Sequence, residues 1–571
     1  MSGREAVGVV LSGATARRFD FVVLEGSEGA VSEGMYVAAS SDDGLVVAVV
    51  EGLRYYHEFY EEGDVWIASV RRGRRIPEGL AARRYLRGRA RAVALVPQPG
   101  APPEAVRRPP RPGAHVYLVG PEVLEGILGA RPDLEGGAPP HLLPLGFLLG
   151  YEGRGYRAYL DLRALTMHLA VLGTTGSGKS NTVGVVLEEL AAKREADVGI
   201  ARLGGPVPVL VADVNGDYVD FYRYHDIAGG YARVYRLVLG GSMAERGGAP
   251  GHYRAEQRRL VLDLNELDGH ELADAIVTLY RRGPSESSAL QQTYLERLLS
   301  DWERLCGEGL PCDPRRPGRP DFNRVFQSER SLEALLRVVE ADVEAGRVDG
   351  RTAAAVRRQL ANFAGQLSRF GLVDPGYPHM FGGEFVDDLT EPGRPKMALL
   401  DLGLEGATGA GLSLKQFIVY YTARLLFDKF VRYKVEGSGE GRVLLFVLEE
   451  AQNFAPNLSQ YPIGYSVARN VLSLVATQGR KFGLALALVT QRPRYVDPTI
   501  LNMVNTFIIH RVAPADVSFV ENVTGGVGGG LGRGLTTMER GVAIVVGQMN
   551  PSPHPLLVRV RKRAHHDVAG A

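Results

Sequence analysis

A glycine-rich loop between an apolar segment and a helical segment constrains the fold of this chain more than any other feature. The loop has the sequence GTTGSGKS and runs from Gly173 to Ser180. It follows the apolar run 169–172 and precedes the helical pattern of 183–190. Between a strand and a helix, this pattern indicates a P-loop, in which backbone N–H groups surround the phosphates of a nucleotide. The chain is therefore predicted to contain an α/β core that binds a nucleoside triphosphate.

Two side chains of this loop have specific expected roles. Lys179 is expected to reach the outer two phosphates, and the Ser180 hydroxyl is expected to bind Mg²⁺. The alternative interpretation is a glycine-rich turn with an exposed lysine. The residues expected to contact the nucleotide are Gly173, Thr174, Thr175, Gly176, Ser177, Gly178, Lys179 and Ser180.

Length and composition limit the class of protein. A chain of 571 residues is too long for one ordinary core, so two to four structural units are expected. No apolar run is long enough to cross a membrane and no signal peptide is evident, which predicts a soluble cytoplasmic protein. The two cysteines, Cys306 and Cys312, have no histidine cluster nearby, so we expect incidental thiols rather than a disulfide framework or a zinc site.

Arginines are concentrated in one part of the chain, although its formal net charge is only +1. Such a stretch is typical of a surface that faces a polyanion. Solvated arginines on a protein from a hot environment would give the same pattern, and both interpretations remain open. The arginines concerned are Arg71, Arg72, Arg74, Arg75, Arg83, Arg84, Arg87, Arg89, Arg91, Arg107, Arg108 and Arg111.

The first part of the chain has the pattern of a small β-barrel. Short strand-like runs with glycine between them occupy 7–11, 19–23, 35–38 and 45–50. A connector rich in proline and arginine follows, and two later runs, at 115–119 and 144–150, are expected to close the barrel. The barrel domain is therefore predicted to span 1–160.

From the P-loop onward, buried strand-like runs alternate with helical patterns, which indicates a parallel sheet covered on both faces. The expected strands are 169–173, 207–214, 397–402, 443–448, 484–490, 506–512 and 541–547. Between the second and third of these, apolar residues recur at helical spacing, which predicts an inserted helical subdomain. The predicted domains after the barrel are 161–265 and 373–550 for the two parts of the core, 266–372 for the insertion and 551–571 for a C-terminal extension.

A pair of acids follows one of the expected strands. The apolar run 443–448 ends at Glu449 and Glu450, as in a Walker B element. In phosphoryl transfer one acid orients the Mg²⁺ shell and another polarises the attacking water, so Glu449 is assigned to the metal and Glu450 to the water. Many P-loop enzymes have aspartate at the first of these positions. The alternative is a pair of surface glutamates.

Polar residues flank the next strand at both ends. Gln491 follows it and is the candidate sensor of the γ-phosphate. Arg480 and Lys481 precede it, on the connection from a helix. An arginine delivered from a neighbouring subunit stabilises charge on the transferring phosphoryl group, so Arg480 is proposed as that arginine, with Lys481 and Arg511 as weaker candidates. The alternative is a solvated basic turn.

Four motifs in this order resemble the HerA family, which belongs to the HerA/FtsK group of hexameric DNA-pumping ATPases. The resemblance implies a RecA-like core, an N-terminal β-barrel called the HAS barrel and an inserted helical region, and it spans nearly the whole chain. The motifs are GTTGSGKSN at 173–181, DVNGDY at 213–218, LEEAQNF at 448–454, and GRKFG at 479–483 followed by TQRP at 490–493.

The resemblance adds site residues and two departures. It implies that Asn181 belongs to the nucleotide site and that Pro553 and His554 return towards the nucleotide, the alternative being a plain exit loop. An arginine is expected before His168 in some relatives, where this chain has methionine. The family also tends to have glutamate where this chain has Asp217, which leaves the role of this acid open.

The resemblance further implies ATP and Mg²⁺ as cofactors, with ATP bound between the subunits of a six-membered ring. It implies sequence-independent binding of duplex DNA, and a nuclease of the NurA type that docks through the barrel. The implied pathway is resection of DNA ends in double-strand break repair. Two alternatives remain open: a DNA pump in segregation, conjugation or phage defence, and a scaffold that nucleotide binding controls without any motor activity.

Overall fold

The computed structural model divides the chain into two compact units. The first unit comprises 1–138, 144–160 and 524–561, and the second comprises 139–143, 161–523 and 562–571. The described residues are 5–57, 60, 67, 70–73, 84–98, 101–132, 139–192, 196–197, 202–203, 207–223, 231–246, 255–279, 286–394, 396–438, 442–461, 465–525 and 534–564.

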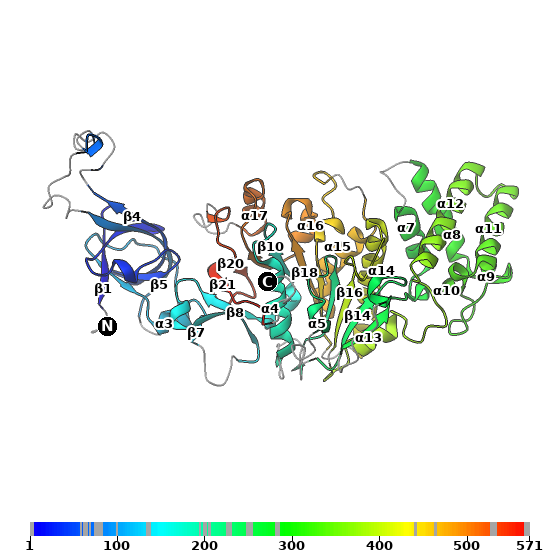
Figure 1. Cartoon of the computed structure of the whole chain (residues 1–571), viewed down its shortest axis with the longest axis horizontal. Helices are drawn as coiled ribbons and strands as arrows, with labels where there is room; N and C mark the ends of the chain where they lie inside the picture. The colour runs from blue at the N-terminus through cyan, green and yellow to red at the C-terminus, as the bar shows by residue number, and fades with distance from the viewer. Residues whose placement is uncertain are drawn as a thin grey trace. The chain divides into compact units, whose positions relative to one another are not determined.

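The first unit contains a closed six-stranded barrel, drawn in blue in Figure 1. Its strands run in the order β1-β2-β5-β4-β3-β6, and their inward side chains, such as Phe19, Phe21 and Val37, are buried. The prediction of an N-terminal barrel is therefore confirmed. The strands are β1 (Ala6–Val10), β2 (Arg18–Val23), β3 (Tyr36–Ser41), β4 (Gly44–Tyr56), β5 (Tyr85–Val96) and β6 (His115–Leu118).

Strand β5 was not predicted because it lies in the arginine-rich stretch. Its arginines alternate with buried Leu86 and Ala90, so they point to the outer face of the barrel. There Asp20 accepts hydrogen bonds from Arg87 and Arg89, at 2.5 and 3.0 Å. Their role towards a polyanion stays a prediction. Three other arginines of the stretch lie outside the described residues: Arg74, Arg75 and Arg83.

The segment 144–150 does not close the barrel, contrary to expectation. The other run expected to close it, 115–119, forms β6 and does so, because β6 pairs with both β1 and β3. The predicted segment forms β8, which pairs with β21 and not with a barrel strand. Glycine is needed here, because a Cβ at Gly146 would lie 2.2 Å from the Arg559 carbonyl oxygen. The strand order around β8 is β20-β21-β8-β9-β7, with β20 (Val542–Gly547), β21 (Leu556–Val560), β8 (Leu142–Leu148), β9 (Tyr156–Asp161) and β7 (Arg131–Pro132).

A parallel sheet forms the centre of the second unit. Its strands run in the order β15-β14-β16-β13-β17-β18-β10-β19, and every neighbouring pair is parallel. The carboxyl ends of its strands therefore meet at one edge, where ligands of such sheets bind. The strands are β10 (Leu169–Leu172), β13 (Val209–Asp213), β14 (Val234–Val238), β15 (Ala255–Arg259), β16 (Met397–Asp401), β17 (Leu444–Leu448), β18 (Leu484–Thr490) and β19 (Thr506–Ile509).

Six of the seven expected strands lie in this parallel arrangement, but the seventh, 541–547, forms β20 and pairs antiparallel with β21, so its prediction as a parallel strand is wrong. The first two strands of the order, β15 and β14, were not predicted. The edge strand β15 has the sequence AEQRR, which lacks the apolar run of a buried strand. Three longer helices belong to this core: α4 (Lys179–Ala192), α14 (Leu412–Val435) and α15 (Ala468–Gln478). Shorter elements are α3 (Pro121–Gly126) in the first unit, and β11 (Ala196–Asp197), β12 (Arg202–Leu203), α5 (Asp220–Arg223), α6 (Met243–Arg246), α13 (Gly383–Leu389), α16 (Pro498–Leu501) and α17 (Val517–Val523) in the second. No helix among the described residues is long and apolar enough to span a membrane.

The predicted helical insertion is confirmed and stands at one end of the second unit, in green in Figure 1. Its longer helices are amphipathic, and α12 buries Val356, Leu360 and Phe363. Side-chain caps fix several helix starts, as where Asp349 accepts backbone N–H bonds from the first turn of α12. The helices are α7 (Gly269–Leu279), α8 (Glu286–Ser300), α9 (Trp302–Gly307), α10 (Phe322–Gln327), α11 (Glu329–Glu344) and α12 (Gly350–Arg369).

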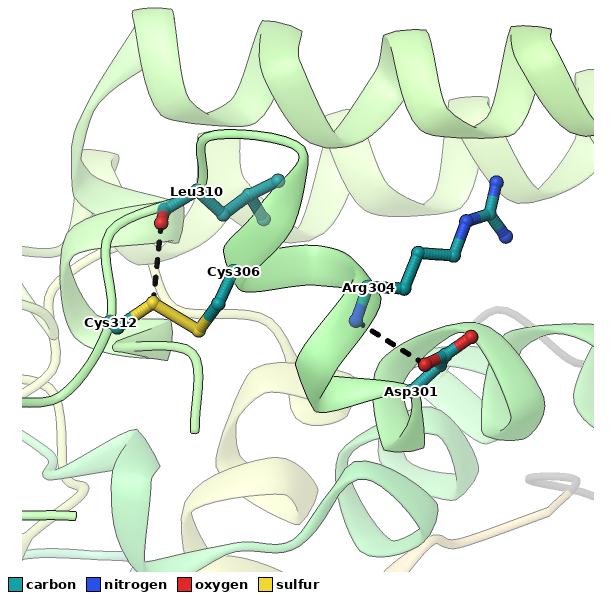
Figure 2. The surroundings of a disulfide bond; sticks show 5 residues. All are labelled: Asp301, Arg304, Cys306, Leu310 and Cys312. Atoms are coloured by element: carbon teal, nitrogen blue, oxygen red, sulfur yellow. Dashed lines mark hydrogen bonds between the residues drawn. A yellow bond between two sulfur atoms is a disulfide. The ribbon is translucent and has the colours of Figure 1, made fainter. Parts of the chain in front are cut away.

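The two cysteines form a disulfide, so the prediction of two incidental thiols is wrong. Figure 2 shows Cys306 near the end of α9 bonded to Cys312 after the following turn. Gly309 has φ +87°, a left-handed conformation that turns the chain back and brings the two Cα atoms within 5.9 Å. That distance lies within the usual range for disulfides. A spacing of six residues does not reveal such a turn.

Candidate nucleotide-hydrolysis site

The P-loop follows buried strand β10 and has a preformed shape. Ser177 Oγ donates a hydrogen bond to the Thr174 carbonyl oxygen at 2.7 Å, and the Thr174 N–H donates to the Arg511 carbonyl oxygen at 2.7 Å. Gly176 has φ +73°, which leaves the loop free to turn its N–H groups inward. The loop thus has the backbone geometry that fits a phosphate group.

Gly173 lies where no side chain fits. A Cβ at this position would be 2.7 Å from both His510 Cβ and Ser177 Oγ. We therefore expect Gly173→Ala to lower the free energy of unfolding by about 1–3 kcal/mol, as overpacking does, and to weaken ATP binding. Denaturant unfolding and an ATP titration measure the two effects. Gly365→Ala in α12 is the control, because a Cβ there meets open space; equal effects of the two variants would contradict the explanation.

Lys179 begins α4 and points back to the loop. Its Nζ donates a hydrogen bond to the Thr174 carbonyl oxygen at 3.0 Å. Burial lowers the pKa of Lys179, while the nearby carboxylates of Glu450, Glu449 and Asp217 act in the opposite direction. The ammonium group therefore already lies at the mouth of the loop, where it can exchange a carbonyl oxygen for a phosphate oxygen.

Asp217 contacts the residue that was predicted to bind Mg²⁺. Ser180 Oγ donates to Asp217 Oδ2 at 2.7 Å. The Asp217 N–H in turn donates to Asp213 Oδ1 at 2.9 Å, so the aspartate at the end of β13 orients the segment that carries Asp217. The sequence motif DVNGDY contains both aspartates, but the motif alone did not show which of them faces the P-loop.

A buried acidic group lies beside Ser180. Glu449 accepts hydrogen bonds from the Tyr218 hydroxyl at 2.7 Å and the Asn215 amide at 3.5 Å. Burial, together with the charges of Asp213 and Asp217, raises the pKa of Glu449. Burial also raises the pKa of Asp213 to about 7. Mg²⁺ prefers oxygen ligands, so the Ser180 hydroxyl, Asp217 and Glu449 have the donor chemistry for this ion, whereas both oxygens of Asp213 accept backbone N–H bonds. Among the described residues, no group of three or more acidic, histidine or cysteine side chains is arranged to hold a metal ion.

Glu450, Gln491 and the P-loop are joined by hydrogen bonds. The Gln491 amide donates to both carboxylate oxygens of Glu450, at 3.2 and 3.3 Å. The Thr175 hydroxyl donates to Gln491 Oε1 at 2.5 Å. The structure therefore brings together three residues that were predicted from separate motifs. Glu450 has φ +48°, a backbone conformation that is uncommon for residues other than glycine and that clusters at functional sites.

Gln452 is a residue that the sequence did not single out. Its amide donates to Glu450 Oε2, and its carbonyl oxygen accepts from the Thr490 hydroxyl at 2.6 Å. Thr490 is the last residue of β18, immediately before Gln491. Gln452 therefore fixes Glu450 relative to the end of the neighbouring strand.

Arg480 and Lys481 lie on the exposed turn Gly479–Phe482, before the amino end of β18. Gln491 follows the carboxyl end of the same strand. A strand of seven residues spans about 20 Å at ~3.3 Å per residue. Arg480 is therefore at the opposite edge of the sheet from the P-loop of its own chain. The structure does not bring Arg480 and the P-loop together within one subunit.

The motifs of this site match those of a known family. The family described as "Helicase HerA, central domain" matches residues 143–402. This range contains the P-loop and the segment with Asp213 and Asp217, and it ends before Glu449. The relatives described next extend over the remaining motifs.

Several relatives carry the HerA name. "Probable DNA double-strand break repair helicase HerA" of Methanocaldococcus jannaschii is 24% identical over 77% of this chain and 79% of its own length. "DNA double-strand break repair helicase HerA" of Sulfurisphaera tokodaii is 24% identical over 97% of this chain and 93% of its own length. The protein of the same name in Pyrococcus furiosus is 25% identical over 97% and 92%. The chain therefore resembles the HerA helicases over most of its length.

Solved structures show a weaker likeness to this chain. VirB4 of Thermoanaerobacter pseudethanolicus has a TM-score of 0.47 at 13% identity, covering 75% of this chain and 98% of its own. The conjugative coupling protein TrwBdeltaN70 has a TM-score of 0.41 at 13% identity, covering 74% and 91%.

Three residues predicted to contact the nucleotide have other partners or positions in the structure. Asn181 Oδ1 accepts a hydrogen bond from the Arg563 backbone N–H at 3.0 Å. Pro553 and His554 lie between β20 and β21 in the first unit, where burial lowers the pKa of His554. Their contacts with a nucleotide stay predictions.

His168 precedes β10 and is buried. Burial lowers its pKa from 6.5 to about 4, and Arg480 acts in the same direction. The folded state therefore favours the neutral ring, so the stability that His168 contributes is present above pH 6.5 and lost as the pH falls to 4. Over this pH range we expect the free energy of unfolding of the wild type to fall by about 3 kcal/mol more than that of the His168→Gly variant. Denaturant unfolding at pH 7 and pH 4 measures the difference, and equal losses would contradict it.

Proposed function

We propose that this chain is a HerA-type ATPase and an ATP-driven translocase of duplex DNA. It would work in the cytoplasm as a six-membered ring, together with a nuclease in DNA end resection for double-strand break repair. The names of the relatives support the repair pathway. The observation that carries the proposal is the contact of Gln491 with both Thr175 of the P-loop and Glu450, because it links nucleotide binding to the candidate base for hydrolysis.

The residues divide the chemistry among them. Lys179 and the loop N–H groups bind the phosphates, and Ser180 and Glu449 would hold Mg²⁺, with Asp217 next to Ser180. A bound Mg²⁺ would supply positive charge that neutralises the phosphate oxygens. Glu450 accepts a proton from the attacking water, and Gln491 responds to the γ-phosphate because it touches the loop and the base.

The position of Arg480 supports a ring. It is exposed and far from the P-loop of its own chain, so it acts on the ATP of a neighbouring subunit, and a repeated contact of this kind closes into a ring. Loops that face the channel would grip DNA phosphates, which carry charge but little sequence information. A nuclease of the NurA type would dock through the N-terminal barrel.

Displacement of a third strand tests translocation. A linear duplex that carries a triplex-forming strand is incubated with the protein, Mg²⁺ and ATP, with and without a NurA-type nuclease. We expect ATP-dependent displacement that is lost with Glu450→Gln and falls as salt rises, because phosphate contacts release counterions. Rings that bind ATP and DNA but never displace the strand, even with the nuclease present, would contradict a motor and favour the scaffold.

A further inference from the structure

His168 has an unusual backbone for its residue type. Its φ is 65° and its ψ is 152°, a region that residues other than glycine rarely adopt. The side chain is buried, with 2% of its surface exposed. Such a conformation persists only where surrounding contacts hold it, so the contacts of the imidazole indicate what His168 does.

The imidazole makes two hydrogen bonds to the backbone of other segments. Nε2 lies 2.9 Å from the Ala476 carbonyl oxygen, and Nδ1 accepts from the Leu486 N–H at 3.0 Å. These partners assign the proton to Nε2, which donates to Ala476. Ala476 lies in the last turn of α15, and Leu486 lies near the start of β18. The two bonds therefore flank 477–485, the segment that carries Arg480.

Two further contacts hold the segment 477–485 in place. Phe482 packs edge-to-face on Phe427 of α14, with ring centroids 5.8 Å apart. Gly483 has φ +88°, and a Cβ there would lie 2.5 Å from the Arg442 carbonyl oxygen. The turn is therefore anchored at its base while Arg480 remains exposed. His168 joins both ends of this turn to the segment leading into the P-loop strand.

We propose that His168 is a positioning residue that holds the Arg480 turn against the base of the P-loop strand. It couples the nucleotide site of one subunit to the arginine that this subunit delivers to its neighbour. This inference rests on the proposed function in one respect, the action of Arg480 in trans. No atom of His168 touches the nucleotide in this account.

His168→Gly tests the role with little change to the backbone, because glycine adopts this conformation without strain. We expect kcat for ATP hydrolysis to fall by about 10²-fold, as for a displaced catalytic group, with an unchanged Kd for ATP. His168→Asn, which keeps a hydrogen-bonding amide, should be intermediate, and it replaces His168→Gly in every assay if the glycine variant does not fold. Wild-type kcat in the variant would overturn the proposal.

Mixed rings separate positioning of the arginine from support of the P-loop. His168→Gly subunits are mixed with Lys179→Ala subunits, which have a damaged P-loop and an intact Arg480. The proposal predicts recovered hydrolysis, because the Lys179→Ala subunits deliver a well-placed arginine to the intact P-loops of their neighbours. If His168 supports only its own P-loop, the P-loops of both kinds of subunit are impaired. The mixture then stays inactive.

A control mixture of Arg480→Ala with Lys179→Ala subunits tests the underlying assumption. It should also recover hydrolysis. An active control beside an inactive His168→Gly mixture overturns the role of His168 alone. An inactive control overturns the action of Arg480 in trans, and the coupling with it.

Discussion

Replacing Arg480 by alanine is expected to lower kcat for ATP hydrolysis by about 10³-fold or more, as removal of an arginine finger does. The guanidinium stabilises charge that develops on the phosphoryl group in the transition state, so the Kd for ATP should change little. Steady-state kinetics and an ATP titration on the same preparation separate the two quantities. The position of Arg480 before the amino end of β18 means that this loss appears only in assembled rings.

Lys481→Ala is the matched control for Arg480→Ala. Lys481 is the next residue of the same exposed turn and carries the same charge. A loss confined to Arg480→Ala would assign the effect to the guanidinium, whereas equal losses would indicate that the turn contributes only its charge. Undiminished turnover by Arg480→Ala rings would remove the arginine from the mechanism.

Glu450→Gln is expected to lower kcat by about 10²–10⁴-fold, the usual contribution of general acid–base catalysis. Glutamine keeps the size of the side chain but does not accept a proton from water. Because Lys179 and the loop make the phosphate contacts, ATP should still bind. Single-turnover hydrolysis measures the chemical step and nucleotide titration measures binding.

Glu449→Gln distinguishes the two acids. Glu449 is assigned, with Ser180, to the binding of Mg²⁺. Its replacement should therefore raise the Mg²⁺ concentration needed for half-maximal hydrolysis. Glu450→Gln should not be rescued by added Mg²⁺. Rescue of Glu450→Gln by Mg²⁺ would reverse the assignment of the two carboxylates.

Much of the site was predictable because each motif directly follows a strand. In a parallel sheet, the carboxyl ends of neighbouring strands lie at one edge, so the order of the motifs sufficed to bring Lys179, Glu450 and Gln491 together. The P-loop was the strongest signal, because its glycines are required by close backbone approach, as at Gly173.

Other features depend on backbone angles or on contacts that no short motif encodes. The bond from Ser180 to Asp217 and the bonds that Gln452 makes require the three-dimensional path of two separate loops. The left-handed turn at Gly309 brought the two cysteines together. In the barrel, β5 was missed because its arginines alternate with the buried inward side chains, and of the two runs expected to close the barrel only 115–119, which forms β6, does so.

Hydrolysis of ATP with and without linear duplex DNA is the direct test of an ATP-driven DNA motor. The purified protein and its Glu450→Gln variant are measured side by side, in the presence of Mg²⁺. We expect duplex DNA to stimulate hydrolysis, and both the basal and the stimulated rate to fall by about 10²-fold or more in the variant. Ring formation and ATP binding with no hydrolysis in either condition would contradict this expectation, and would favour a scaffold that nucleotide binding controls.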